Sequence, residues 1–137
     1  MPPISSRDFQ TAAAQRLMAA KTLFHQTLTL DAQYLGGYVV ECSLKALILD
    51  KTPDTEKDDT LKKITKGAKM HDPEKLLELL WERGVKPPVD LRKRMARFVG
   101  TWATDLRYET GRRDTGETRA FLNTAEAVYD WVEASLS

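Results

Sequence analysis

The sequence predicts an all-α protein, an up-and-down bundle of four to five helices built from a single domain of 137 residues. Two observations support this fold class. Apolar residues recur at spacings of three and four in several segments, which is typical of amphipathic helices. Ser, Asp, Pro and Gly residues interrupt the chain where such segments would begin and end. No segment alternates apolar and polar residues as a half-buried strand would, and the length suits one hydrophobic core.

The first half of the chain predicts two long helices. The first should begin at a Ser5 or Ser6 cap and run to about Leu28, with one apolar face. The second should span about 31–50, with Asp31 as its N-cap. The polar stretch 51–59 predicts an exposed loop, and a short helix follows near 61–68.

The second half predicts three more helical segments. Asp72 should cap a helix whose first turn holds Pro73 and which ends at Gly84. A long helix should start near Val89 and turn Leu91, Met95, Phe98 and Val99 inward. A last helix should span about 115–135. The residues expected to face inward on it are Ala120, Ala127, Val128, Trp131 and Val132, with Tyr129 near that face.

Composition excludes several classes of protein. Hydrophobic residues make up 42% and charged residues 30%, which is ordinary for a soluble globular domain. One cysteine, Cys42, excludes an intramolecular disulfide and suits a reducing cytoplasm. The first residues hold no apolar signal-peptide core, and no segment resembles a membrane span. A cytoplasmic protein that does not engage a membrane is therefore expected.

The net charge of +1 is unevenly distributed. Residues 83–119 hold ten Lys and Arg against five Asp and Glu, so a basic face is expected there. Such a window is more often a solvated helix surface than a nucleic-acid site, because the sequence pI of about 7.8 is far from strongly basic.

The segment 32–50 is apolar almost all round, yet it contains Gly36, Gly37, Glu41 and Lys45. Adjacent glycines inside a helix indicate close approach of another helix, from this chain or from a second copy. Glu41 and Lys45 stand four residues apart and can pair on one helix face. Tyr34 and Tyr38 lie on the same stripe. This stripe should line an interface or a cleft, or form a polar network that fixes the helix register.

Three segments resemble the HEPN family of small helical domains, which are often encoded beside nucleotidyltransferases. They are GGYVVECSLKALIL (36–49), HDPEKLLELL (71–80), and DLRYE (105–109) followed by the final helix at 117–136. The resemblance covers nearly the whole chain. It implies a four- to five-helix bundle, a homodimer, and a cleft, often at the dimer interface, that takes RNA or a nucleotide.

Many members of the family are metal-independent ribonucleases, whose signature is an Arg followed a few residues later by a His. The resemblance matches that Arg to Arg107, but no histidine follows His71 in this chain. The pattern "RYE" is more similar to the nucleotidyltransferase-associated branch that lacks nuclease activity. No catalytic residue is therefore assigned, and Arg107 and Tyr108 are candidates only if the protein is a ribonuclease.

The candidate binding residues are Tyr38, Glu41, Lys45, Arg107, Tyr108, Arg112 and Arg113. Arginine forks suit phosphate, and a tyrosine ring can stack on a base. The alternative is structural: Arg107 pairs with Glu41 across the bundle, while Arg112 and Arg113 are only solvated.

No metal site or cofactor is expected, because the two histidines and the cysteine lack the spacing of metal ligands. His71 and His25 are interpreted as structural or surface residues.

Three functions stay open. The first is a HEPN-like protein that binds RNA, a nucleotide or a nucleotidyltransferase-type partner, in a toxin–antitoxin or stress-response module and without Arg–His ribonuclease chemistry. The second is an atypical metal-independent ribonuclease whose site surrounds Arg107. The third is a structural dimerisation module.

Overall fold

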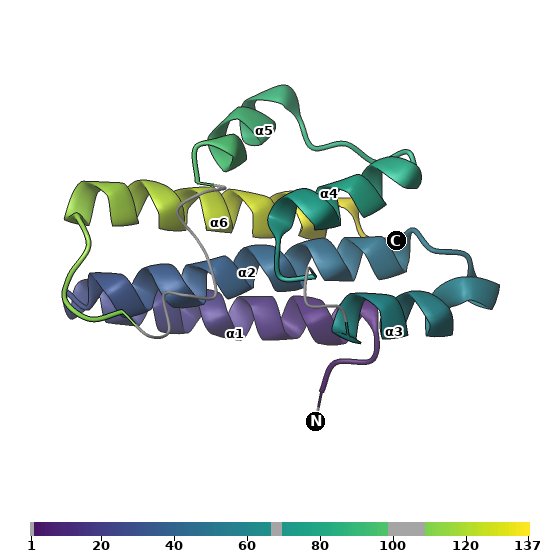
Figure 1. The fold of residues 1–137 in the computed structure, drawn as a ribbon, viewed down its shortest axis with the longest axis horizontal. Coiled ribbons are helices and arrows are strands. Elements are labelled where there is room, and N and C mark those ends of the chain that lie inside the picture. Colours follow the sequence, from purple (N-terminus) through teal and green to yellow (C-terminus); the bar gives the residue numbers. More distant parts are fainter. Residues whose placement is uncertain (1, 67–69, 99–108) are drawn as a thin grey trace.

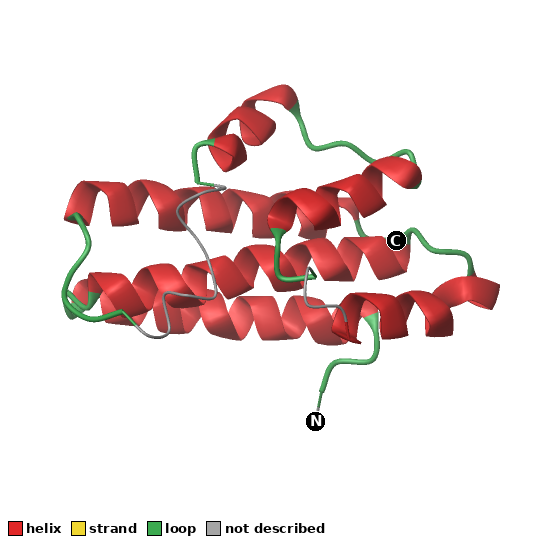
Figure 2. Cartoon of the chain, in the orientation of Figure 1, coloured by secondary structure: helices red, strands yellow, loops and turns green. Residues whose placement is uncertain are grey.

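The computed structural model describes residues 2–66, 70–98 and 109–137, which form six α-helices and one short 3-10 helix. The elements are α1 (Ser6–His25), α2 (Thr29–Asp50), η1 (Asp54–Glu56), α3 (Lys57–Lys66), α4 (Pro73–Glu82), α5 (Val89–Ala96) and α6 (Thr115–Ser135). Figure 2 shows only helices and loops in these residues. The all-α prediction is confirmed.

The helices are arranged around α2 (Figure 1). Helix α2 packs against α1, α6, α4 and α3, while α5 packs on the outer side of α6. Successive helices run in alternating directions along the long axis of the molecule, as an up-and-down bundle requires. The described residues form six α-helices: the short helix expected near 61–68 is α3, and the segment expected to form a long helix from Val89 forms the short helix α5.

Side-chain caps fix the start of three helices. The Ser5 hydroxyl accepts a hydrogen bond from the Asp8 N–H at 3.1 Å, and the Asp72 carboxylate accepts one from the Glu74 N–H at 3.0 Å. Asp114 caps α6 in the same way. The prediction that Asp31 caps α2 was wrong. That helix begins at Thr29, and Asp31 lies in its first turn, where a negative charge favours the helix dipole.

Two of the predicted segments differ from the structure. Residues 51–59 are not a loop throughout, since η1 occupies 54–56 and α3 begins at Lys57. Acidic residues in the first turn of α3 and lysines in its last turn suit the helix dipole, so the charged composition favours a helix there. Helix α5 ends at Ala96, and Val99 lies outside the described residues.

The inner face of α6 was only partly predicted. Val128 and Val132 are fully buried, but Ala120 is exposed and Phe121 is buried. Ala127, Tyr129 and Trp131 are half-buried. The stripe that faces the core is Thr118, Phe121, Leu122, Ala125, Val128 and Val132, at helical spacing.

Gly36 lets α6 approach α2 closely. A Cβ atom on Gly36 would lie 2.8 Å from both Leu122 Cδ2 and Phe121 Cε1, closer than real carbon atoms pack. The predicted close helix contact is thus confirmed, and the partner is a helix of the same chain.

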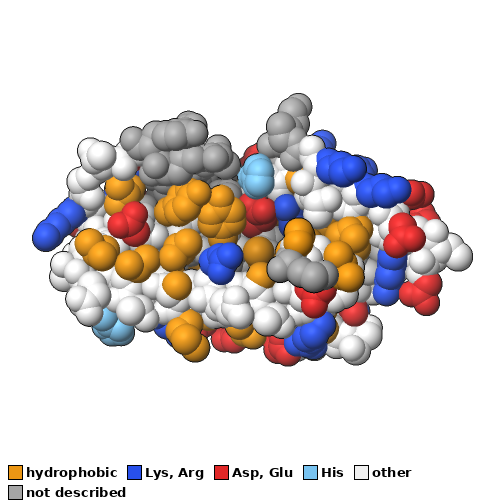
Figure 3. Space-filling model, turned by 90° about the horizontal axis from the view of Figure 1, so that it is seen from below, with side chains coloured by type: hydrophobic (Ala, Val, Ile, Leu, Met, Phe, Trp, Pro, Cys, Tyr) orange, Lys and Arg blue, Asp and Glu red, His pale blue; other side chains and the backbone are white. Residues whose placement is uncertain are grey.

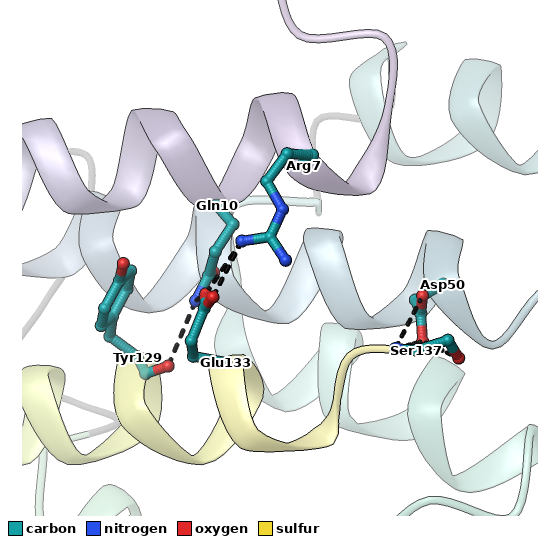
Figure 4. A network of polar contacts seen from close by, with 6 residues as sticks. All are labelled: Arg7, Gln10, Asp50, Tyr129, Glu133 and Ser137. Atoms are coloured by element: carbon teal, nitrogen blue, oxygen red, sulfur yellow. Dashed lines mark hydrogen bonds and ion pairs between the residues drawn. The ribbon is translucent and has the colours of Figure 1, made fainter.

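A polar network fastens the end of α6 to α1 and α2 (Figure 4). Glu133 accepts hydrogen bonds from Arg7 and from the Gln10 amide, each at 2.9 Å, and these bonds lower the pKa of Glu133. The backbone N–H of Ser137 donates to Asp50 at 3.2 Å. These contacts fix the register of α6 along the bundle.

Substituting Gly36→Ala should destabilise the fold, because the added methyl group overpacks the α2–α6 contact. We expect the free energy of unfolding to fall by about 1–3 kcal/mol, measured by urea denaturation. Gly116→Ala is the matched control, since its Cβ would meet only Asp114 Oδ2, at 3.3 Å. That control should cost less than Gly36→Ala, because only the end of one surface side chain has to shift by a few tenths of an ångström. Equal effects of the two substitutions would contradict this packing argument.

Candidate functional site

Helix α2 carries a buried chain of ionic contacts. Lys45 Nζ lies 2.9 Å from Glu41 Oε2, and the other carboxylate oxygen of Glu41 lies 2.9 Å from His71 Nδ1. Glu41 and Lys45 are each 5% exposed, whereas the side chain of His71 is 43% exposed. The chain of contacts therefore runs from the interior of the bundle to its surface.

The pairing explains how a buried helix can hold two charges. Removing either charge from water is costly, and the cost is offset only where the partner is close and the remaining lone pairs are satisfied. The spacing of Glu41 and Lys45 lets one turn of helix supply the first contact, and His71 supplies the second.

The contact of His71 with Glu41 was not foreseen from the sequence. Thirty residues separate the two side chains, and no spacing rule joins them. The sequence does indicate where α4 begins, through the Asp72 cap and Pro73. His71 directly precedes this start, and the fold brings it against Glu41 of α2.

An open groove of about 790 Å³ lies between the first half of α1, the N-terminal segment and α2. We call it the α1–α2 groove. Its walls include Arg16 from α1 and Tyr38, Glu41 and Cys42 from α2, together with Asp8 and apolar side chains. Figure 3, which views the molecule from below, shows hydrophobic side chains gathered on that face, with acidic, basic and histidine side chains among them. The groove thus joins an aromatic ring, a carboxylate and a cation.

The aromatic part of this wall is held in place by a second ring. Tyr34 and Tyr38 contact edge to face, with ring centroids 5.1 Å apart and hydroxyl oxygens 3.0 Å apart. Both residues are half-buried. The predicted stripe of Tyr34, Tyr38, Glu41 and Lys45 therefore lies along one side of α2 at this site.

Cys42 is not a reactive thiol in this environment. Burial, and then the nearby Glu41 carboxylate, raise the pKa of the Cys42 thiol to about 11. The thiol is protonated at neutral pH and is a poor nucleophile. Within residues 2–66, 70–98 and 109–137, no three His, Cys, Asp or Glu side chains gather as metal ligands.

The remaining candidate residues lie elsewhere or are not described. The backbone N–H of Arg113 donates to the Thr29 hydroxyl at 2.8 Å, and its guanidinium pairs with Glu109. Thr29 begins α2, so this contact is twelve residues, about 18 Å along the helix, from Glu41. Arg112 is exposed in the same segment. Arg107 and Tyr108 lie outside the described residues, and the pairing of Arg107 with Glu41 stays a prediction.

Substituting Glu41→Met should strongly destabilise the protein, because it leaves the Lys45 ammonium buried without its carboxylate. We expect a loss of about 3–5 kcal/mol in urea denaturation. The double variant Glu41→Met with Lys45→Met removes both charges and should recover most of that loss.

The matched control is the exposed pair of Lys21 and Glu126, whose side chains are 47% and 38% exposed. There Glu126→Met should cost no more than about 1 kcal/mol. A double variant at 41 and 45 that is as unstable as Glu41→Met would contradict the pairing argument.

Comparisons with known proteins complete the description of the site. No described helix is long and apolar enough to span a membrane. Neither a search of curated proteins nor a search of solved structures found a match. A family model described as the HEPN domain matches residues 6–135, which is nearly the whole chain. The chain belongs to the HEPN domain family.

Proposed function

We propose that this HEPN protein binds nucleotide units, free or within RNA, in the α1–α2 groove, and that it does so without cleaving them. The observation that carries the proposal is the groove itself, which places Arg16, Tyr38 and Glu41 around one opening. Its volume of about 790 Å³ falls within the range of small-ligand sites, about 300–1,000 Å³.

Each of these side chains suits one part of a nucleotide. The ring of Tyr38 offers a face for base stacking, and the exposed Arg16 offers a planar fork for phosphate. The Glu41 carboxylate can accept hydrogen bonds from a base amino group, the role that Glu takes opposite cytosine N4. Lys45 and His71 are positioning residues, because their contacts hold that carboxylate in place.

Binding without cleavage is favoured by the sequence after Arg107. A ribonuclease of this family would use a histidine downstream of that arginine, and none is present. His71 is the nearest histidine upstream, and its Nδ1 is engaged by Glu41. An atypical ribonuclease at Arg107 and Tyr108 is therefore the alternative that the experiment below must exclude.

A homodimer is part of the proposal. The exposed side chains of Ile4 (66%) and Met18 (73%), at the N-terminus and on α1, are apolar groups that a second copy could cover. Sedimentation of the free protein measures this, and a monomer at all concentrations would contradict it. The nucleotidyltransferase partner and the toxin–antitoxin or stress-response setting rest on the family resemblance, and co-purification of a partner tests them.

The test incubates labelled single-stranded RNA with the protein in EDTA and compares native and denaturing gels. Arg16→Ala should weaken binding about ten-fold, because a charge-assisted phosphate contact is lost. Lys62→Ala, which removes an exposed cation of α3 away from the groove, is the matched control and should bind like wild type. Tyr38→Ala should weaken binding as well, because the groove loses its stacking ring.

Two results would overturn the proposal. One is wild-type binding that neither Arg16→Ala nor Tyr38→Ala weakens. The other is RNA cleavage in EDTA that disappears in Arg107→Ala, which would support the ribonuclease instead.

A further inference from the structure

The α4–α5 surface carries an exposed tryptophan beneath two cations. Trp81, at the end of α4, is 51% exposed. Lys86 Nζ lies 4.5 Å from the centroid of the indole ring, and the Arg92 guanidinium lies 5.9 Å from it. These residues come from three consecutive pieces of chain: α4, the connection after it, and α5.

The charge of this surface is strongly positive. Residues 81–98 hold six Lys and Arg against two acidic residues, Glu82 and Asp90, in a chain whose net charge is only +1. Helix α5 turns Leu91 and Met95 inward, and most of its other side chains are polar. The exposed cations of this surface are Lys86, Lys93, Arg94 and Arg97.

In the part of the chain that the structure describes, no ion pair joins Glu82 or Asp90 to these exposed cations. Glu82 lies 3.9 Å from Arg83, whose guanidinium also donates to Thr52 and to the Leu79 carbonyl of the bundle. Asp90 lies in the first turn of α5, where it favours the helix dipole. Nε of Arg92 is buried and has no hydrogen-bond partner among the described residues. The aromatic ring is therefore flanked by Lys86 and Arg92, and the following chain adds the exposed cations Lys93, Arg94 and Arg97.

We propose that the α4–α5 surface binds single-stranded nucleic acid. A base stacks on the solvent-exposed part of the Trp81 indole, and Lys86, Arg92 and the outer cations of α5 contact the phosphates on either side. Stacking platforms flanked by cations are how sequence-tolerant single-strand binders hold their ligands. Lys86 is an exposed, flexible side chain, so it can leave the ring for a phosphate when a base arrives.

The ring is what favours single-stranded nucleic acid over other anionic partners. An acidic peptide would use the cations alone, and a duplex keeps its base faces stacked inside, away from the indole. The proposal does not rest on the α1–α2 groove. Helix α5 lies on the opposite side of α2 from α1, so the two surfaces can be tested separately (Figure 1).

The experiment measures fluorescence anisotropy of a labelled single-stranded oligonucleotide of low sequence complexity. Trp81→Ala should weaken binding about ten-fold, the loss expected for one stacked base. Trp81→Phe, which keeps an aromatic face, should recover most of it. Val89→Ala truncates an exposed apolar side chain of α5, 55% exposed, and should bind like wild type.

Salt and competitors give the second readout. Arg97→Ala should reduce the slope of log affinity against log salt by about one phosphate contact. A duplex of equal length and a polyglutamate peptide should compete poorly. Circular dichroism melts check that each variant is folded. Trp81 is 51% exposed, so its substitution should leave the fold intact.

The proposal is overturned if wild type does not bind, if Trp81→Ala binds as Val89→Ala does, or if polyglutamate competes as well as the oligonucleotide. Arg16→Ala separates the two sites. If Arg16→Ala loses binding and Trp81→Ala binds normally, the α1–α2 groove is supported and the α4–α5 surface is rejected. If Trp81→Ala loses binding and Arg16→Ala binds normally, the α4–α5 surface is supported and the groove is rejected.

Discussion

The burial of α2 is the constraint on which the rest of the structure depends. Sixteen of its 22 residues are buried, so most of the helix surface needs a covering element, and only the side that lines the α1–α2 groove is partly open. Helices α1, α6, α4 and α3 supply that cover. Two local requirements follow. Where Phe121 and Leu122 of α6 pack on α2, at Gly36, an added Cβ would lie 2.8 Å from both side chains. Where α2 carries buried charges, Glu41 and Lys45 must form an ion pair, because an unpaired buried charge is costly.

The same pair of charges connects the core to the candidate site. Glu41 contacts Lys45 on one side and His71 on the other, and it also forms part of the wall of the α1–α2 groove. Because both oxygens of the Glu41 carboxylate are engaged, its orientation is fixed, and so is the direction in which it can accept a hydrogen bond from a molecule in the groove. The contacts of Glu41 with Lys45 and His71 would therefore serve both the stability of the fold and binding in the groove, and a substitution at Glu41 would disturb both. The α4–α5 surface is different, because Trp81 and its cations lie on the outside of the bundle and contribute little to the core.

The helices and several of their ends could be predicted from the sequence because their signals are local. Ser5, Asp72 with Pro73, and Gly84 act through the backbone beside them. The charge pairing of Glu41 with Lys45 is local as well, one turn apart. Contacts between distant segments were missed: His71 with Glu41 across 30 residues, and Lys86 over Trp81. The choice of Ala120 instead of Phe121 for the core was an error of helix phase, since Phe121, Ala125, Val128 and Val132 are at helical spacing. Arg112 and Arg113 have the right chemistry for phosphate, but the fold places Arg113 at the far end of α2 from Glu41, a distance that no local pattern encodes.

Native-state hydrogen exchange of α2 tests the central claim most directly. If α2 is the element that all others cover, the amides of its most buried turn, from Leu44 to Leu49, open only when the whole protein unfolds. Their exchange free energy should then equal the free energy of unfolding from urea denaturation, while amides of the outlying α5 exchange at lower cost. The account would be contradicted if these α2 amides exchanged through a local opening whose free energy is lower than that of unfolding, while the amides of α1 and α6 stayed protected.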